Sequence, residues 1–132
     1  EEMLGLLQAM QTGSKGLIIN TYAENPRDCL ERLELFCQMG TNHIAPEVLR
    51  NQISSLLDII VFVSRFRDGS RKVRSIVGVQ GAEGTMLRLQ NIFHFYEESA
   101  ESADVRGAFK HSGMRPKCLA KLADTHVQLP WS

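Results

Sequence analysis

The sequence contains only three cysteines, Cys29, Cys37 and Cys118, which is an odd number. Cys29 and Cys37 stand on one expected helix, where their separation corresponds to about 12 Å of rise. That distance is too great for a disulfide between them. The composition therefore favours reduced thiols and a cytoplasmic compartment rather than a disulfide scaffold.

Long apolar runs are also missing. None approaches the roughly 18 residues that a membrane-spanning helix requires, and the longest, Leu56–Val63, is interrupted by Asp58. No stretch has the pattern of a signal peptide. The first residue is Glu rather than Met and already belongs to an amphipathic pattern, so we expect the sequence to begin within a larger structure.

Neither sign of charge is in excess, since 15 basic residues balance 15 acidic ones. The balance gives no overall attraction to nucleic acid or acidic lipid, and any such binding would need a local patch. The histidines have no metal-ligand spacing with one another or with cysteine, so no metal site is predicted. No Ser-His-Asp or Cys-His arrangement is visible in chain order, although a triad assembled only in space would leave no such trace. The four histidines are His43, His94, His111 and His126.

What remains is an ordinary globular composition. Apolar residues make up 43% of the 132 residues and charged residues 23%. A chain of this length can bury a core without a metal or disulfide, so we expect one domain.

The first half of the sequence predicts an α/β pattern. An amphipathic helix ends at Gly13, and the short β-branched run Leu17–Tyr22 predicts a strand. Asn25 and Pro26 fit the N-cap and first positions of a second helix, and Asp28 adds a carboxylate to its first turn. That helix is expected to end at Gly40.

The second half predicts a helix followed by an antiparallel meander. The helix begins near Pro46, and the Asp-Gly pair at 68–69 predicts a hairpin turn between two strands. An acidic, polar loop is expected at 97–104, a short extended piece at 106–113, and a small C-terminal helix opened by Pro116. The three expected strands are 59–66, 71–79 and 85–95.

The stretch Gly13-Ser14-Lys15-Gly16 superficially resembles a phosphate-binding loop. A P-loop needs Gly-Lys-Ser/Thr in that order, after a strand and before a helix. Here Lys follows Ser, and the segment leaves a helix, so a helix C-cap followed by a turn is favoured. The functional alternative is a loop that lies near a phosphate bound elsewhere.

Two clusters of charge have both a functional and an ordinary interpretation. The hairpin cations would suit nucleic-acid phosphates, but Asp68, the zero net charge and the lack of aromatic residues in the turn favour a solvated hairpin. Along the second helix, i,i+4 pairs between Asp28 and Arg32 and between Arg27 and Glu31 favour a solvated ladder that also contains Glu34. Alternatively, Arg27 or Arg32 meets a nucleotide or a neighbouring subunit. The hairpin cations are Arg65, Arg67, Arg71, Lys72 and Arg74.

An ordered set of short motifs runs along nearly the whole chain. They are Leu7-Gln8-Ala9-Met10, Thr12-Gly13, Gly16, Ala23, Pro26-Arg27-Asp28, Arg32-Leu33-Glu34, Leu49-Arg50, Gln52-Ile53, Asp68-Gly69-Ser70-Arg71-Lys72-Val73, Gly81, Glu83-Gly84, Leu89-Gln90, Ile92-Phe93, Phe95, Gly107, Phe109, Gly113, Arg115-Pro116 and Leu119. In this order the motifs resemble the C-terminal part of the Flp (tight-adherence, CpaF-like) pilus assembly ATPases, within the type II/type IV secretion ATPase superfamily.

The resemblance implies that residues 1–132 form a partial domain, the C-terminal portion of a RecA-like P-loop ATPase whose Walker A and Walker B elements lie upstream. It implies a hexameric ring that uses ATP and Mg²⁺ to drive pilin assembly or protein secretion. The full-length parent would be cytoplasmic and peripheral at the inner membrane, on the platform proteins of the secretion or pilus apparatus. No nucleic-acid partner is implied.

The resemblance also places site residues. The family's histidine box corresponds to the stretch that holds Asn20 and Tyr22, which would be the catalytic positions, with Tyr22 at the end of a strand where α/β sheets bind ligands. Tyrosine cannot replace histidine as a proton carrier at neutral pH, although its hydroxyl can donate a hydrogen bond. By the same resemblance, the residues near the nucleotide are Gly13, Ser14, Gly16, Arg27 and Arg32, and Ser14 replaces a second family histidine.

Because both Walker elements are absent from these residues, we expect the isolated chain neither to bind ATP tightly nor to hydrolyse it. Whether the parent is an active ATPase stays open. The alternatives are a degenerate, weakly active or regulatory ring subunit of the same fold, or a nucleic-acid-binding module that uses the basic hairpin.

Overall fold

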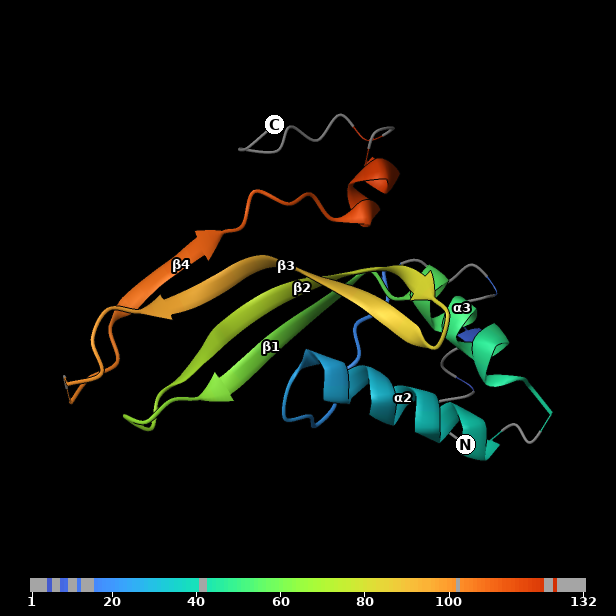
Figure 1. Cartoon of the computed structure of the whole chain (residues 1–132), viewed down its shortest axis with the longest axis horizontal. Helices are drawn as coiled ribbons and strands as arrows, with labels where there is room; N and C mark the ends of the chain where they lie inside the picture. Colours follow the sequence, from blue (N-terminus) through green and yellow to red (C-terminus); the bar gives the residue numbers. More distant parts are fainter. Residues whose placement is uncertain are drawn as a thin grey trace.

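The computed structural model describes residues 5, 8–9, 12, 16–40, 43–101, 103–122 and 125. Within them, two helices precede a sheet, and a single 3-10 helix follows it (Figure 1). The elements are α2 (Pro26–Gly40), α3 (Pro46–Leu56), β1 (Ile59–Arg65), β2 (Arg71–Glu83), β3 (Met86–Glu97), β4 (Gly107–His111) and η1 (Lys117–Leu122).

The four strands form one antiparallel sheet in the order β1-β2-β3-β4. The predicted meander is confirmed; β2 continues to Glu83 and β3 to Glu97, beyond their predicted ends, whereas β1 ends one residue early, at Arg65. Gly69 and Gly84 have φ angles of 82° and 58°, the left-handed conformation that favours glycine in tight turns. The extended piece near 106–113 becomes the edge strand β4, which pairs with β3.

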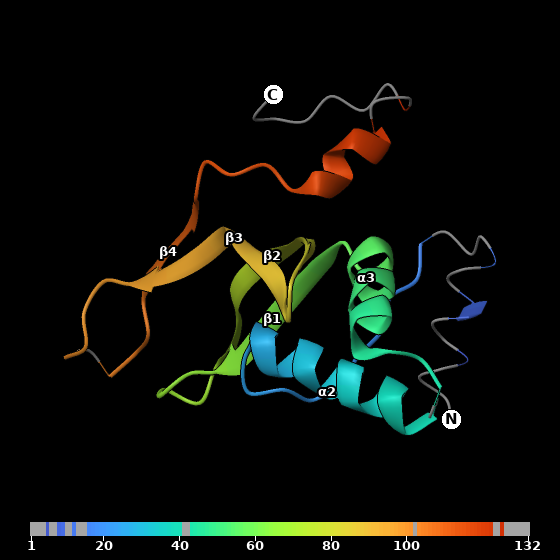
Figure 2. The same cartoon turned by 45° about the vertical axis from the view of Figure 1, so that its right-hand side comes forward.

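Both helices cover one side of the sheet, and the C-terminal segment crosses the other side (Figures 1 and 2). The core between helices and sheet is apolar and almost fully buried, because each helix has a stripe of apolar residues at helical spacing. On the opposite side, buried Pro116 lies near Gly78 of β2. The core residues are Leu30, Leu33, Cys37, Leu49, Ile53 and Leu87.

The start of α2 is built as the sequence predicts. The Asn25 side chain accepts a hydrogen bond from the Asp28 amide at 2.9 Å, which satisfies one of the free N–H groups of the first turn. The Asp28 carboxylate in turn accepts a hydrogen bond from the Glu24 amide at 2.8 Å. Pro26 stands at the first helical position, where no amide hydrogen is needed.

The strand predicted at Leu17–Tyr22 is wrong for the described structure. Residues 17–23 have no regular secondary structure and join no strand of the sheet. Ile18 is 94% exposed, so its β-branched side chain has no packing partner. Apolar, β-branched composition favours a strand only where a neighbouring strand supplies hydrogen bonds and packing.

The C-terminal helix also differs from its prediction. Residues 117–122 form a 3-10 helix, whose tighter winding is seen in the hydrogen bond from the Leu119 amide to the Pro116 carbonyl at 3.1 Å. Most of the first predicted helix, ending at Gly13, falls outside the described residues. The acidic stretch after Glu97 is a connection between β3 and β4, as predicted.

Candidate functional site

The predicted catalytic residues lie on an exposed segment of the described chain, and their catalytic role stays a prediction. Tyr22 is 91% exposed and Asn20 is also exposed, and no hydrogen bond or ion pair is described for either. Because the described residues 17–23 form no strand, the predicted position of Tyr22 at a strand end is wrong. The reason is the one given for the strand itself, since no strand of the described sheet pairs with this segment.

The segment 13–16, predicted as a helix C-cap followed by a turn, is described only in part. Gly16 is exposed, has a φ of 81°, and a Cβ added there would meet nothing within 4 Å. This conformation suits a turn. Gly13 and Ser14 lie outside the described residues.

The two arginines predicted near the nucleotide have different environments. Arg32 is bound to Asp28, with its Nε 3.0 and 2.9 Å from the two carboxylate oxygens, so the predicted ladder pair is confirmed. Arg27 does not pair with Glu31 among the described ion pairs. It turns toward the sheet, where its Nη2 donates a hydrogen bond to the Leu87 carbonyl at 3.3 Å.

A shallow hollow of about 220 Å³ lies between the start of α2 and the sheet. Arg27 is its charged residue, and it also lines a neighbouring hollow along β3. Arg27 brings a positive charge to the hollow, whereas the N-terminal end of α2 is already occupied by its own Asn25 cap and by the Asp28 carboxylate. The lining residues are Asn25, Pro26, Arg27, Val77, Leu89 and Asn91.

The charged groups at the start of α2 stabilise the helix rather than form a reactive site. The Glu24 amide, and then the Arg32 guanidinium, lower the pKa of Asp28, and Asp28 raises the pKa of Arg32. A carboxylate held ionised by these donors is suited to capping rather than to proton transfer. The three cysteines are not activated either, because burial raises the pKa of each thiol.

The basic hairpin is largely neutralised by acids of the same chain. Arg67 and Arg74 contact Glu97 at 3.6 and 3.8 Å, and the Lys72 ammonium lies 3.7 Å from Asp68. Arg74 also lies over the Phe66 ring, 4.3 Å from its centroid. The prediction of a solvated hairpin rather than a uniform phosphate-binding patch agrees with these pairs.

Among the described acidic residues, Asp68 has the most strongly lowered pKa. Its carboxylate accepts hydrogen bonds from the Ser70 hydroxyl and amide and from the Val105 amide at 2.8 Å. These donors, the Ser70 hydroxyl first, hold the pKa of Asp68 well below its usual range. The residue therefore fixes the hairpin turn to the segment before β4, and it stays ionised throughout the neutral range.

Sequence reasoning missed an ion pair between the helices. Glu34 was expected on the solvated face of its helix, yet its carboxylate lies 2.6 Å from the Arg50 guanidinium of α3, and both side chains are largely buried. No spacing rule relates residues of two different helices, so the sequence contained no signal for this contact. Among the described residues, no group of three or more His, Cys, Asp or Glu side chains could hold a metal ion.

Comparison with known proteins gives one kind of match. No family model matches the chain. The chain is 28% identical over 119 residues to the "Putative conjugal transfer protein" of Mycobacterium tuberculosis, in strain CDC 1551 (MT3759) and equally in strain H37Rv (Rv3659c). The match covers 90% of this chain but 32% of those proteins, so the chain spans about a third of the length of its curated relatives. In the part of the chain that the structure describes, no helix is long and apolar enough to cross a membrane.

Proposed function

We propose that this chain is the C-terminal part of an ATPase that powers conjugal transfer, type II/IV secretion or Flp pilus assembly. The observation that carries the proposal is the similarity to conjugal transfer proteins, which extends over nearly the whole chain. The ordered motifs from Leu7 to Leu119, which lie in nearly the same stretch of sequence, agree with the proposal through the resemblance that they imply.

The described residues do not fit a complete nucleotide site. Asn20 and Tyr22 are exposed, and the described residues contain neither a Walker A glycine loop nor a Walker B strand. The proposal therefore assigns the binding of ATP and Mg²⁺ to Walker elements in a longer polypeptide. This chain would contribute Arg27, which lines the hollow at the start of α2, and the segment that leads into that helix.

The rest of the assembly belongs to the same proposal. The parent would form a hexameric ring in the cytoplasm, attached to inner-membrane platform proteins of the secretion or pilus apparatus. A nucleic-acid-binding module is a weaker candidate, because three of the five hairpin cations already have acidic partners within the chain.

The first test is the reading frame that encodes this sequence. The proposal requires a Walker A glycine loop and a Walker B strand upstream of Glu1. A frame without them would refute it. Where they are found, steady-state ATP hydrolysis is measured on the longer polypeptide and on the 132-residue chain, and turnover is expected only for the longer one.

A substitution at Tyr22 distinguishes an active ATPase from a degenerate one. The degenerate alternative is suggested by Tyr22 and Asn20, which differ from the histidine box that the resemblance implies. Hydrolysis by the unmodified parent would make it a working motor. No hydrolysis, restored by Tyr22→His but not by the nearby control Leu17→His, would make it a degenerate or regulatory ring subunit.

A further inference from the structure

Two loops that are far apart in the sequence meet at one end of the molecule, which we call the hairpin end. They are the β1–β2 turn, residues 66–70, and the connection from β3 to β4, residues 98–106 (Figures 1 and 2). Arg67 Nη2 donates a hydrogen bond to the Ser99 carbonyl at 2.8 Å, and the Val105 amide donates one to Asp68 at 2.8 Å. These bonds fix the two loops side by side.

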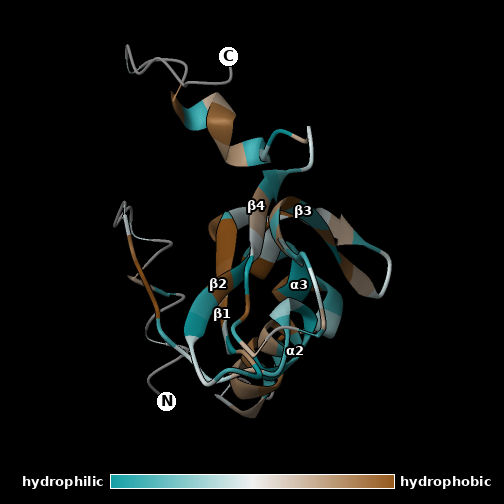
Figure 3. Cartoon of the chain, turned by 90° about the vertical axis from the view of Figure 1, so that its left-hand side faces the viewer, coloured by the Kyte–Doolittle hydropathy of each residue, from teal (hydrophilic) through white to brown (hydrophobic). Residues whose placement is uncertain are grey.

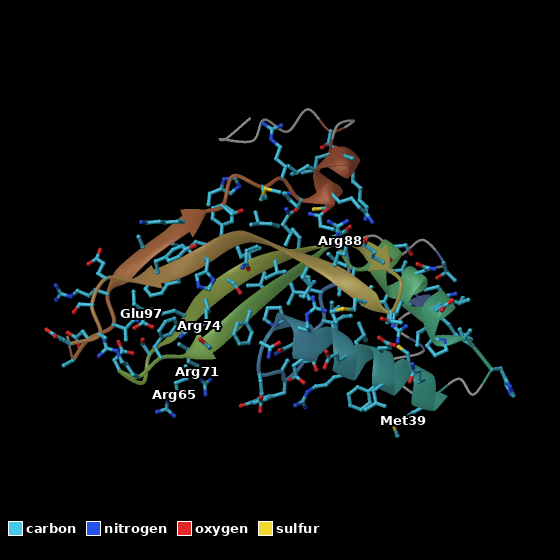
Figure 4. All side chains as sticks on the ribbon, viewed as in Figure 1. Met39, Arg65, Arg71, Arg74, Arg88 and Glu97 are labelled. Atoms are coloured by element: carbon cyan, nitrogen blue, oxygen red, sulfur yellow. The ribbon has the colours of Figure 1, made fainter. Side chains whose placement is uncertain are left out.

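The hairpin end contains two arginines for which no acidic partner is found among the described residues. Arg65 and Arg71 are exposed and stand directly opposite each other in the β1–β2 register. No ion pair is described for either residue within the described chain, whereas the hairpin's other three cations contact Asp68 or Glu97. Figure 4 shows both arginines beside the β1–β2 turn, at the closed end of the hairpin. Like charges directly opposite each other destabilise a sheet, so a partner that neutralises them would be favourable.

The neighbouring connection has the opposite charge. Glu98, Glu101 and Asp104 are exposed, and no ion pair is described for them within the same residues. Arg106 is also exposed there, which leaves the connection with a net negative charge. Figure 3 looks at this end and shows mostly hydrophilic colours in its turns. A positive patch and a negative patch therefore lie side by side on one surface.

The two adjacent patches of opposite charge indicate which class of partner could bind there. A nucleic acid or an acidic lipid surface would be attracted by the arginines but repelled by the acidic connection beside them. A partner that carries both signs in the same arrangement avoids that conflict. A second copy of this chain has that arrangement, and a twofold rotation about an axis through the hairpin end would bring each positive patch onto the other copy's negative patch.

We propose that the hairpin end is an isologous contact between two copies of this chain, in which Arg65 and Arg71 of one copy meet Glu98, Glu101 and Asp104 of the other. The contact does not depend on the proposed function. Exposed ion pairs are individually weak and are screened by salt. We therefore expect an association that is detectable at low ionic strength and lost at high ionic strength.

Sedimentation equilibrium of the 132-residue chain tests this expectation. At about 0.02 M salt, where screening is weak, the mass should approach twice the 14.8 kDa of one chain. At about 1 M salt, where the Debye length is near 3 Å, it should return to that of a monomer.

Charge-reversal variants test whether these arginines and acidic residues make the contact between the two copies. The variants R65E/R71E and E98K/E101K should each be monomeric at low salt, because like charges then meet across the contact. Mixed in equal amounts, they should form a heterodimer, since the exchanged charges are again complementary. The control R88E/R115E reverses two exposed arginines away from the hairpin end and should dimerise as the unmodified chain does. Circular dichroism checks that each variant is folded, and R65Q/R71Q replaces the first variant if it is not.

Three results would overturn the proposal. One is a monomer at both salt concentrations. Another is a dimer that neither reversal disrupts, which would point to the uncovered edge of β1, where Ile59, Val61 and Val63 are exposed. The third is a pair of monomeric reversal variants that do not associate when mixed.

Discussion

At the scale of single residues, Asn20 and Asn25 show how position decides the role of one side-chain type. Asn25 caps α2 through its hydrogen bond with the Asp28 amide, whereas Asn20 is exposed and no hydrogen bond of its side chain is described. We predict that Asn25→Ala lowers the free energy of unfolding by about 1 kcal/mol. The matched change Asn20→Ala should leave it unaltered. Urea denaturation measures both, and equal midpoints for the two variants would contradict the assignment of the cap.

Asp68 predicts a dependence of stability on pH. Its pKa is lowered in the folded chain by the Ser70 and Val105 donors, so its carboxylate stabilises the fold above the unfolded-state pKa of about 4. That contribution is lost as the pH falls below this value toward the folded pKa. Asp68→Asn should therefore lower the melting temperature at pH 7, and the difference from the unmodified chain should shrink as the pH falls below about 4.

Thermal denaturation at neutral and acidic pH measures this difference. Glu31→Gln is the control, because Glu31 is exposed and has no described partner. A gap between the Asp68→Asn variant and the unmodified chain that persists unchanged in acid would show that shape, rather than charge, accounts for the effect of Asp68.

At the scale of elements, the periodicity of the sequence predicted the two described α-helices and the meander. The Asn25-Pro26 start and the Asp68-Gly69 turn are local signals, in which the residues that make the structure stand next to one another. The strand prediction at Leu17–Tyr22 was wrong because a strand also needs a neighbouring strand, and composition does not supply one. The prediction that Glu34 lies on a solvated helix face was wrong for a related reason, since its partner Arg50 belongs to another helix.

The pairing of β3 with β4 depends on Gly107, whose structural role no pattern in the sequence predicts. A Cβ at Gly107 would lie 2.1 Å from the Tyr96 carbonyl oxygen and 2.8 Å from Phe95 Cζ, so only glycine lets the strands approach. We predict that Gly107→Ala destabilises the fold by about 1–3 kcal/mol through overpacking and loosens the pairing of β4. Amide exchange should rise in β4 but not in β1.

Gly84→Ala is the control for the glycine prediction. Gly84 has open space around it but a φ of 58°, so its substitution costs about 1–2 kcal/mol of backbone strain without affecting β4. Equal exchange rates of the β4 amides in the two variants would contradict the steric assignment at Gly107.

At the scale of the whole molecule, the sequence predicted an α/β fold better than it predicted a site. Arg27, one of the proposed nucleotide residues, does line a hollow, but Tyr22 and Asn20 are exposed and do not join it. Their role was inferred from a resemblance that also requires upstream residues. The sequence also could not predict which hairpin cations lack a described acidic partner. That depends on which of them lie close to Asp68 and Glu97 in the folded chain.

The C-terminal segment crosses the side of the sheet that the helices leave open. Pro116 is buried near Gly78, Lys117 Nζ lies 3.4 Å from the Ser54 carbonyl, and Lys121 contacts Asp58 at 2.7 Å. A chain that lacks residues 114–132 should be less stable by about 2 kcal/mol than one that lacks only residues 123–132, chiefly because burial of apolar surface is lost. Lys121→Met keeps the segment and should cost at most about 1 kcal/mol, since the ion pair is exposed. Urea denaturation of the three variants distinguishes these contributions. If the two truncated chains are equally stable, the segment lies on the sheet without stabilising it. If Lys121→Met loses as much stability as the longer truncation, the ion pair, rather than apolar burial, is the source of the stabilisation.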